Sequence, residues 1–419
     1  MAFRRNRWFL LLLLFVPMNF ILGIDRNALT VSSPLVQQAL GIDPLRMAEL
    51  ITISTAVYAL LQIPSGWLTE RIGVRYALAG ACLMWSIATV LTAFQTHLGG
   101  FFAVRILLGI GQAPDWVACI FALKLLFSDK EREAASSLLL GGLYVGYTAS
   151  GALTAYVMQT FGWRNCFLIY GVIGLVFSAI VFLCYGGPSV EGQRQHTEAR
   201  PQTPHVPVAW REMLLPVAQI SVFYGGVCSV QGFFHVTFPH FMMDHHHLSA
   251  GQAGRLFSIP WASLYGSVLL WGMVIRVFKR RETAARPFPA AHVRLFGIIG
   301  AAAFLASGIL CSSLWGAMTL FVLAMSGVGL CQVLTWSHVQ SFPRATAVVA
   351  GCTALVGNWM SSVGPVWTEM VFKSTHVWSP VAALMLVYGT IAGGMWLLPN
   401  RSVPDRDEQM TPVAGAEFE

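Results

Sequence analysis

The chain has 419 residues, of which 56% are hydrophobic and only 11% are charged, and its mean hydropathy is +0.63. Soluble domains carry about 25% charged residues, so this composition excludes an ordinary soluble protein and indicates an integral membrane protein. The net charge of +7 follows from membrane orientation, as shown below, and gives no argument for nucleic-acid binding.

Apolar segments long enough to cross a bilayer, at about 20 residues each, recur along the whole chain. They fall at residues 8–36, 46–67, 76–96, 99–125, 135–159, 165–186, 213–239, 250–277, 294–312, 315–338, 345–371 and 376–398. A cleaved signal peptide is the alternative for the first segment, but no small-residue cleavage site follows it. The sequence therefore predicts an all-α membrane protein of twelve transmembrane helices.

The basic residues predict the orientation of these helices. With the N-terminus in the cytoplasm, 20 of the 26 Lys and Arg residues fall inside. Three fall outside, and three more lie in or at the edge of spans: Arg46, Arg164 and Lys373, then Arg26, Arg105 and Arg255. This bias follows the positive-inside rule and predicts cytoplasmic N- and C-termini in a bacterial-type inner membrane.

The first apolar segment contains two adjacent charged residues, Asp25 and Arg26. Ionisable residues near the middle of a bilayer are costly, so a functional role is the default hypothesis. Helical spacing places Arg26 on one polar stripe, which faces a water-filled cavity in this interpretation, whereas Asp25 lies about 100° away. The stripe consists of Asn19, Arg26, Thr30, Ser33 and Gln37.

The chemistry of the two charged side chains predicts different roles. Arg26 is always charged and can grip a carboxylate with two N–H groups, so we expect it to bind an anion. Burial favours the protonated form of a carboxyl group, so we expect Asp25 to carry a proton. A purely structural ion pair between helices is the alternative.

A very short cytoplasmic turn, GWLTERIGVRYAL, follows the second span. Its glycines permit a tight turn, and its charges could pair across the cytoplasmic face in one conformation and separate in another. The predicted gating residues of the turn are Gly66, Glu70, Arg71, Gly73 and Arg75. The turn resembles the hallmark loop of the major facilitator superfamily, with Glu70 in place of the usual aspartate. The second half's copy, WGMVIRVFKRR, lacks that acid.

Further motifs resemble the anion:cation symporters of that superfamily, which carry organic anions such as sugar acids. The motifs are DRNALTVSSPLVQQALG, VYALLQIPSG, RILLGIGQAP, GWRNCF and, in the second half, FFHVTFPHF, SIPW and GNWMSSVGP. The resemblance implies that Tyr58 and Asn358 face a central substrate site, and Gln62 joins them as a predicted substrate contact. Other possible cavity groups are Tyr144, Tyr224, Thr237, Ser258 and Trp261.

The fourth span departs from the family pattern. The family usually has a proton-binding glutamate where this chain has Gln112, which cannot titrate. Asp115, three residues further on, could supply a displaced carboxylate, or could instead bond backbone groups freed by Pro114. Arg105 is costly in the same apolar span, and we assign it to the gating group.

A polar stretch divides the twelve segments into two groups of six. Residues 187–212 are rich in Pro, Gly, Gln and charges and predict a flexible cytoplasmic linker. We therefore expect an N-terminal bundle at 1–186, a C-terminal bundle at 213–400 and a cytoplasmic tail at 401–419. Two similar halves favour a transporter with its site between them. Gly142 and Gly146 in the fifth span predict close helix contact.

The eight cysteines show no CxxC spacing, and no nucleotide-binding or nucleophile motif is present. We therefore expect no metal, no cofactor and no enzyme activity. His235 and His338 lie in spans and could relay protons, although packing histidines are the preferred interpretation.

The sequence as a whole predicts a monomeric secondary transporter that imports a small organic anion with protons by alternating access. One alternative is a proton-coupled exporter or a uniporter of a bulkier metabolite, which the loss of glutamate at Gln112 favours. An alternative of another class is a transporter-like sensor that binds a ligand without moving it.

Overall fold

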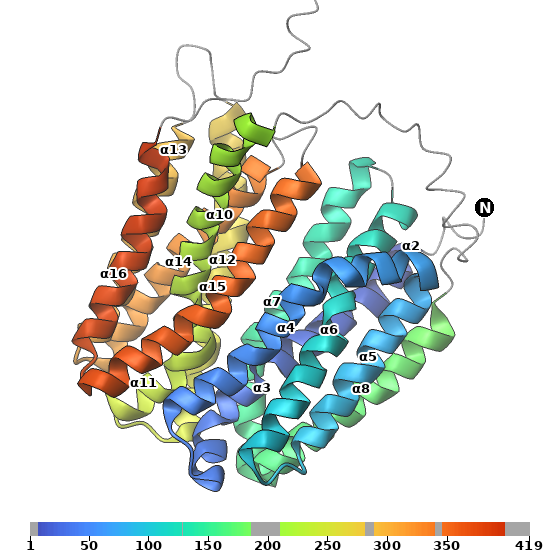
Figure 1. Cartoon of the computed structure of the whole chain (residues 1–419), viewed down its shortest axis with the longest axis horizontal. Helices are drawn as coiled ribbons and strands as arrows, with labels where there is room; N and C mark the ends of the chain where they lie inside the picture. The colour runs from blue at the N-terminus through green and yellow to red at the C-terminus, as the bar shows by residue number, and fades with distance from the viewer. Residues whose placement is uncertain (1–6, 128, 186–209, 281–288, 340–345, 399–419) are drawn as a thin grey trace, which may run out of the picture.

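The computed structural model describes residues 7–127, 129–185, 210–280, 289–339 and 346–398. Within these ranges all elements are helical, which confirms the predicted all-α class (Figure 1). The first group contains α2 (Arg7–Leu10), η1 (Leu11–Phe15), α3 (Val16–Leu40), α4 (Pro44–Ile72), α5 (Val74–Thr92), α6 (Leu98–Leu126), α7 (Asp129–Phe161) and α8 (Trp163–Cys184). The second contains α10 (Trp210–Gly232), η2 (Phe233–Thr237), α11 (Phe238–Asp244), α12 (Ala250–Arg280), α13 (Ala290–Leu310), α14 (Leu314–Val339), α15 (Thr346–Thr375), α16 (Ser379–Gly394) and η3 (Met395–Leu397).

The helices correspond to the predicted spans. Among the described residues, 11 helical segments are long and apolar enough to cross a membrane. The predicted span at 345–371 corresponds to α15, a helix of 30 residues that is not among these 11. Two spans contain a π-helical turn, η1 before α3 and η2 between α10 and α11. The outer and inner sides of the molecule are those assigned by the orientation that the basic residues predict.

Glycine and aspartate set the junctions around α4. Gly41 ends α3 with a φ of +64°, a left-handed conformation that glycine adopts without a steric penalty. Asp43 then caps α4 by accepting a hydrogen bond from the Arg46 backbone N–H at 2.8 Å. At the other end, Gly73 has a φ of +85° and joins α4 to α5 at the turn predicted from the sequence.

Small residues bring α3 and α7 into close contact. A Cβ atom on Gly142 would lie 2.6 Å from the carbonyl oxygen of Val16, and one on Gly146 would lie 2.4 Å from that of Phe20. Gly23 on the facing helix has equally little space, with Leu143 O at 2.6 Å from its hypothetical Cβ. The predicted close approach of the fifth span is therefore confirmed.

The two groups of helices contact each other along a few elements. In Figure 1 the blue-to-green first group and the yellow-green-to-red second group lie next to each other. Across this boundary α4 packs on α15, α7 packs on α12, and α3 contacts both α11 and α12. The predicted linker at 187–212 lies mostly outside the described residues, as does the tail at 401–419, so the domain limits stay a prediction.

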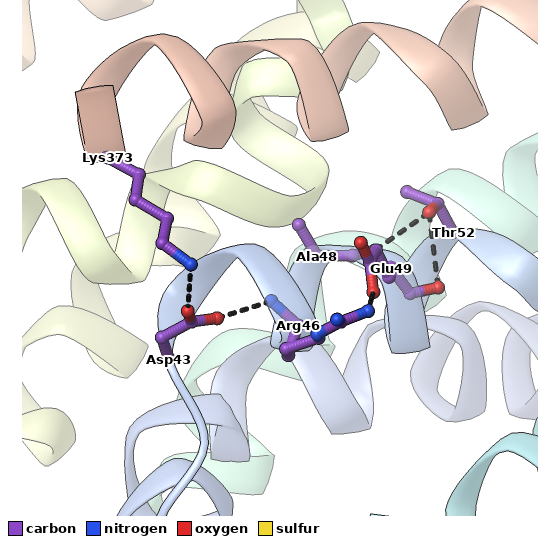
Figure 2. Close-up of polar contacts among 6 residues, drawn as sticks. All are labelled: Asp43, Arg46, Ala48, Glu49, Thr52 and Lys373. Carbon is purple, nitrogen blue, oxygen red and sulfur yellow. Dashed lines mark hydrogen bonds and ion pairs between the residues drawn. The ribbon is translucent and has the colours of Figure 1, made fainter.

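Direct polar contacts join the two groups at their outer ends. Lys373, at the end of α15, donates a hydrogen bond to Asp43 at 2.6 Å (Figure 2). At the other contact between the groups, the Ala152 N–H of α7 donates to Ser258 Oγ of α12 at 3.0 Å. A Cβ on Gly151 would lie 2.6 Å from the Gly254 carbonyl oxygen, so the backbones of these helices almost touch. The outer side is therefore closed.

Candidate substrate and proton site

Arg26 lies half-buried on α3, where the first group of helices faces the second. Its Nε donates to Gln112 Oε1 at 3.1 Å, and its Nη1 donates to the Tyr147 hydroxyl at 3.4 Å. The guanidinium carbon also lies 4.6 Å from the centre of the Tyr58 ring. Because arginine has five N–H donors, these contacts orient the group and still leave donors for a bound anion.

Asp25 is buried behind Arg26 and has different partners. Its Oδ1 accepts a hydrogen bond from Thr89 at 2.7 Å, and its Oδ2 accepts one from Gln112 Nε2 at 3.2 Å. Asp25 is 5% exposed. Gln112 therefore lies between the two charged residues, with its carbonyl oxygen toward Arg26 and its amino group toward Asp25.

Asp115 lies on the same helix as Gln112, three residues further along the chain. Its side chain is fully buried, and neither carboxylate oxygen accepts a hydrogen bond from the described residues. It interacts electrostatically with Arg26 and with Tyr58. The structure thus brings Asp115 into the same cluster as Asp25, as one unpaired acid beside one hydrogen-bonded acid.

Two of the predicted substrate contacts lie in the cluster around Arg26, and the third lies on α15. Tyr58 is buried beside Arg26, and its hydroxyl accepts a hydrogen bond from Gln62 Nε2 at 2.8 Å. Asn358 is half-buried on α15, and within the described ranges no side-chain hydrogen bond joins it to Arg26 or its partners. Its role as a substrate contact stays a prediction.

The polar stripe of α3 is only partly open. Arg26 and Gln37 are half-buried, whereas Asn19 and Thr30 have almost no exposed surface. Asn19 instead donates a hydrogen bond to the Phe15 carbonyl oxygen at 3.1 Å. Spacing on a helical wheel identifies a face, but the neighbouring helix decides which part of that face stays open.

His235 approaches the cluster from the second group of helices. The π-helical turn η2 carries it, and such turns are frequent at functional sites. Its ring lies 4.4 Å from that of Trp261 and 5.6 Å from that of Tyr147, the residue that hydrogen-bonds Arg26. The preferred interpretation as a packing histidine did not predict this position beside Arg26.

A second polar connection crosses between the groups near the middle of the helices. The Tyr144 hydroxyl on α7 donates to Gln332 Oε1 on α14 at 2.8 Å, and Gln332 Nε2 donates to Gln231 Oε1 at 2.8 Å. The sequence identified Tyr144 as a cavity candidate but missed both glutamines. Their signal is a neutral amide in an otherwise apolar span, which is weaker than that of a charge.

The predicted gating residues lie in two places. Glu70 and Arg71 are exposed at the inner end of α4, and Arg71 lies 3.7 Å from the centre of the Trp67 ring. Arg75 donates to the Phe182 carbonyl oxygen of α8 at 2.6 Å. Gly66, one turn before Glu70, has Val117 of α6 at 3.4 Å from its hypothetical Cβ.

Arg105 lies apart from that turn. It is 3% exposed, donates to Thr92 Oγ1 at 3.1 Å and interacts electrostatically with Asp25. Its surroundings are therefore those of the acid cluster, while its assignment to the gate stays a prediction.

Ionisable side chains buried in membrane helices, next to the boundary between two groups of helices, are typical of a secondary transporter. The chain matches the Major Facilitator Superfamily over residues 15–365. It belongs to that superfamily, as the turn at Gly66–Arg75 predicted, and it is a transporter and not an enzyme.

Individual relatives agree with this placement. The chain is 27% identical over 399 residues to the D-galactonate transporter of Escherichia coli O6:H1 (strain CFT073), covering 88% of each chain. It is 21% identical over 400 residues to the hexuronate transporter of Bacillus subtilis (strain 168), covering 93% of this chain and 95% of the relative. These relatives are consistent with the predicted resemblance to the organic-anion symporters.

The fold is also that of a solved transporter. A bacterial homologue of the human lysosomal transporter Spinster, in an inward-facing and occupied conformation, superimposes with a TM-score of 0.75. The match covers 94% of this chain and 96% of that one at 17% sequence identity. It confirms the predicted major facilitator fold.

Proposed function

We propose that this protein imports a sugar acid with a single carboxylate, such as an aldonate or a hexuronate, together with protons. The names of two relatives, a D-galactonate transporter and a hexuronate transporter, support this substrate class. The cluster around Arg26 supplies the matching chemistry, with a cation for the carboxylate and hydroxyl and amide groups for the sugar.

The half-buried guanidinium of Arg26 carries this proposal. Two side chains and one ring hold it in place at the boundary between the helix groups. A fixed planar donor group binds a carboxylate better than a mobile ammonium does. Tyr58 and Gln62 flank it, and Asn358 and the Gln231–Gln332 pair would bind sugar hydroxyls from other sides.

Asp25 and Asp115 are the proposed proton carriers. Burial disfavours the charged form of a carboxyl group, and among the described residues no arginine or lysine donates a hydrogen bond directly to either acid, so we expect both to take up a proton when the site closes. A change in the protonation of Asp25 would affect Arg26 through Gln112, because the Gln112 amide hydrogen-bonds both side chains. One proton with one monocarboxylate would cross the membrane without net charge.

Alternating access is the proposed mode of transport, with the two bundles rocking about this site. The outer contacts Asp43–Lys373 and Ala152–Ser258 would break when the outer side opens. The inner turn with Gly66, Glu70, Arg71, Gly73 and Arg75 would close the opposite side at that stage, and Arg105 would link this movement to Asp25. We place the protein, as a monomer, in a bacterial inner membrane.

Uptake into liposomes tests the substrate class. Purified protein is reconstituted and given radiolabelled D-galactonate, D-galacturonate and, as a polyol without a carboxylate, D-galactitol. We expect saturable uptake of one of the acids and none of the polyol. Uptake of the polyol alone would contradict the role of Arg26, and binding without uptake would identify a sensor.

A further inference from the structure

A buried acid and a histidine lie together at the outer end of the second group of helices, outside the site described above. His240 Nδ1 on α11 is hydrogen-bonded to Glu369 Oε2 on α15 at 2.9 Å. The side chain of Glu369 is 2% exposed and that of His240 is 15% exposed. We infer that this pair is a second proton-binding site, which takes protons from the outside and controls opening of the outer gate.

A pocket gives protons from the outer side access to His240. His240 lines a pocket of about 310 Å³ between α3 and α11, opposite Gln37 and Gln38 of the first group. Glu369 does not line the pocket itself, but it is hydrogen-bonded to His240, which does. A proton from the pocket can therefore bind the imidazole first and be shared with the buried carboxylate.

The charge of the pair depends on its protonation. Histidine is the side chain whose charge ordinarily changes near neutral pH. With a neutral imidazole, an ionised Glu369 leaves a buried negative charge without a cation. One added proton turns the pair into a neutral imidazolium–carboxylate contact, which a low-dielectric environment tolerates better. Proton binding thus changes the net charge at the boundary between the two bundles.

His240 packs against the segment that carries the outer contact of Lys373 with Asp43. The His240 ring lies 5.0 Å from the Phe372 ring and 5.3 Å from the Trp378 ring. Phe372 directly precedes Lys373, which bonds Asp43 across the boundary, and Trp378 donates to Asp244 at the end of α11 at 2.7 Å. A change of charge on His240 therefore acts on the segment that holds the outer contact.

The outer contact itself does not supply this pH response. Its hydrogen bond from Lys373 holds the pKa of Asp43 below the ordinary value of 3.8. Outside acidification in the neutral range leaves that carboxylate charged, so a proton sensor at this end requires another group. The titratable or charged groups on the surrounding elements are Asp43, Arg46 and Glu49 of the α4 region, Asp244, His245, His246 and His247 at and after the end of α11, Arg255 of α12, and Lys373 and His376 after Glu369.

This inference rests on the proposed proton-coupled function. Two measurements distinguish a failure of the inference from a failure of the proposed function. The variant Glu369→Gln removes the carboxylate but can still hydrogen-bond His240, so a purely structural role should survive it. His240→Gln removes the imidazole. Glu49→Gln is the matched control, because Glu49 is an acid at the same end that pairs only on the surface, with Arg46 at 2.8 Å.

The first measurement is exchange of radiolabelled D-galactonate in liposomes, with the inner pH fixed and the outer pH varied from about 5 to 8. We expect the exchange rate of the unmodified protein and of Glu49→Gln to change about fivefold or more, the lower range for linked sites. In both variants of the pair this dependence should be weaker, with the remainder set by Asp25, and exchange and thermal stability should be retained. An unchanged profile in Glu369→Gln would overturn the inference, and so would loss of exchange together with stability.

The second measurement needs no substrate. Liposomes on a solid-supported membrane receive a rapid pH jump, and the transient charge movement is recorded. We expect Glu369→Gln and His240→Gln to move less charge than Glu49→Gln does. Equal charge movement in all three would overturn the inference, whereas failure of D-galactonate uptake alone would contradict only the proposed substrate.

Discussion

Gln112 uses both ends of its amide, accepting from Arg26 and donating to Asp25. Substitution by glutamate would remove the donated hydrogen bond and place two carboxyl groups at the separation of that contact, 3.2 Å. Two carboxyl groups at this distance cannot both ionise, so one would retain a proton. We expect Gln112→Glu to make uptake of the sugar acid depend more steeply on pH.

Proteoliposome uptake at several pH values measures this effect, and Gln159→Glu at the exposed outer end of α7 is the control. A pH profile of Gln112→Glu that matches the unmodified protein would mean that the position holds no proton.

Arg26 offers a second prediction at the level of one side chain. A lysine cannot bond Gln112 and Tyr147 at the same time and present a flat pair of donors to a carboxylate. Loss of a hydrogen bond to a charged group costs about 1.5–3 kcal/mol, so Arg26→Lys should weaken substrate binding about 10- to 100-fold.

The half-saturation concentration in exchange assays measures this change. Arg46→Lys, at an exposed surface pair, is the matched control and should leave it unaltered. An unchanged half-saturation concentration in Arg26→Lys would remove this residue from the site.

The sequence predicted the side chains that differ most from their apolar surroundings. The charges of Asp25 and Arg26 and their angular separation on a helix indicated one buried and one more open group, which the structure has. His235 was named only as a possible proton relay, and its position beside Tyr147 and Trp261 was not predicted, because it depends on how η2 packs against α7 and α12. The glutamines Gln231 and Gln332 meet only after α10 and α14 pack, which spacing along one helix cannot show.

At the level of elements, the α7–α12 contact controls how closely the outer ends approach. The hypothetical Cβ of Gly151 meets Gly254 O and Ser258 Oγ, both at 2.6 Å. Backbone atoms cannot move away easily, and overpacking costs about 1–3 kcal/mol. We expect Gly151→Ala to oppose closure of the outer side and to lower the exchange rate about tenfold or more, since 1.4 kcal/mol corresponds to tenfold.

Gly266→Ala on α12 is the control for this prediction, because its Cβ would meet no atom within 4 Å. The two variants should have the same thermal stability if the contact acts between bundles. Equal exchange rates would show that the α7–α12 contact does not limit the cycle.

The sequence predicted where the helices are more readily than which helices pack against each other. Runs of about 20 apolar residues predicted the spans because no other spanning structure satisfies so long an apolar segment. The close approach at Gly142 and Gly146 was also predicted. The crossing at Gly151 was not, because its partner, Gly254, lies on a helix far away in the sequence.

For the whole molecule, the Asp43–Lys373 contact is expected to bias the balance between outward-open and inward-open states (Figure 2). Asn at position 43 keeps the oxygen that caps α4 but loses the charge. Exposed ion pairs contribute about 0–1 kcal/mol, so Asp43→Asn should raise the outward-open population by up to about fivefold. The external half-saturation concentration should fall by the same factor.

The pH dependence of this contact follows from the direction of its shift. Because Lys373 lowers the pKa of Asp43, the contact contributes to closure at pH above 3.8 and is lost only as pH falls through the lowered value. Asp43→Asn should therefore show its effect equally at about pH 6 and pH 8. An effect confined to one of these values would contradict this explanation.

Proton-driven accumulation tests the central claim most directly, that Asp25 carries the coupling proton while Arg26 holds the anion. Radiolabelled D-galactonate is added outside liposomes that have an inward proton gradient, and its accumulation is measured. Exchange without a gradient is measured separately, and the unmodified protein is compared with Asp25→Asn in both assays. We predict that the unmodified protein accumulates the acid above its outside concentration, whereas Asp25→Asn only exchanges it. Accumulation by Asp25→Asn, or equal loss of accumulation and exchange, would contradict this role of Asp25.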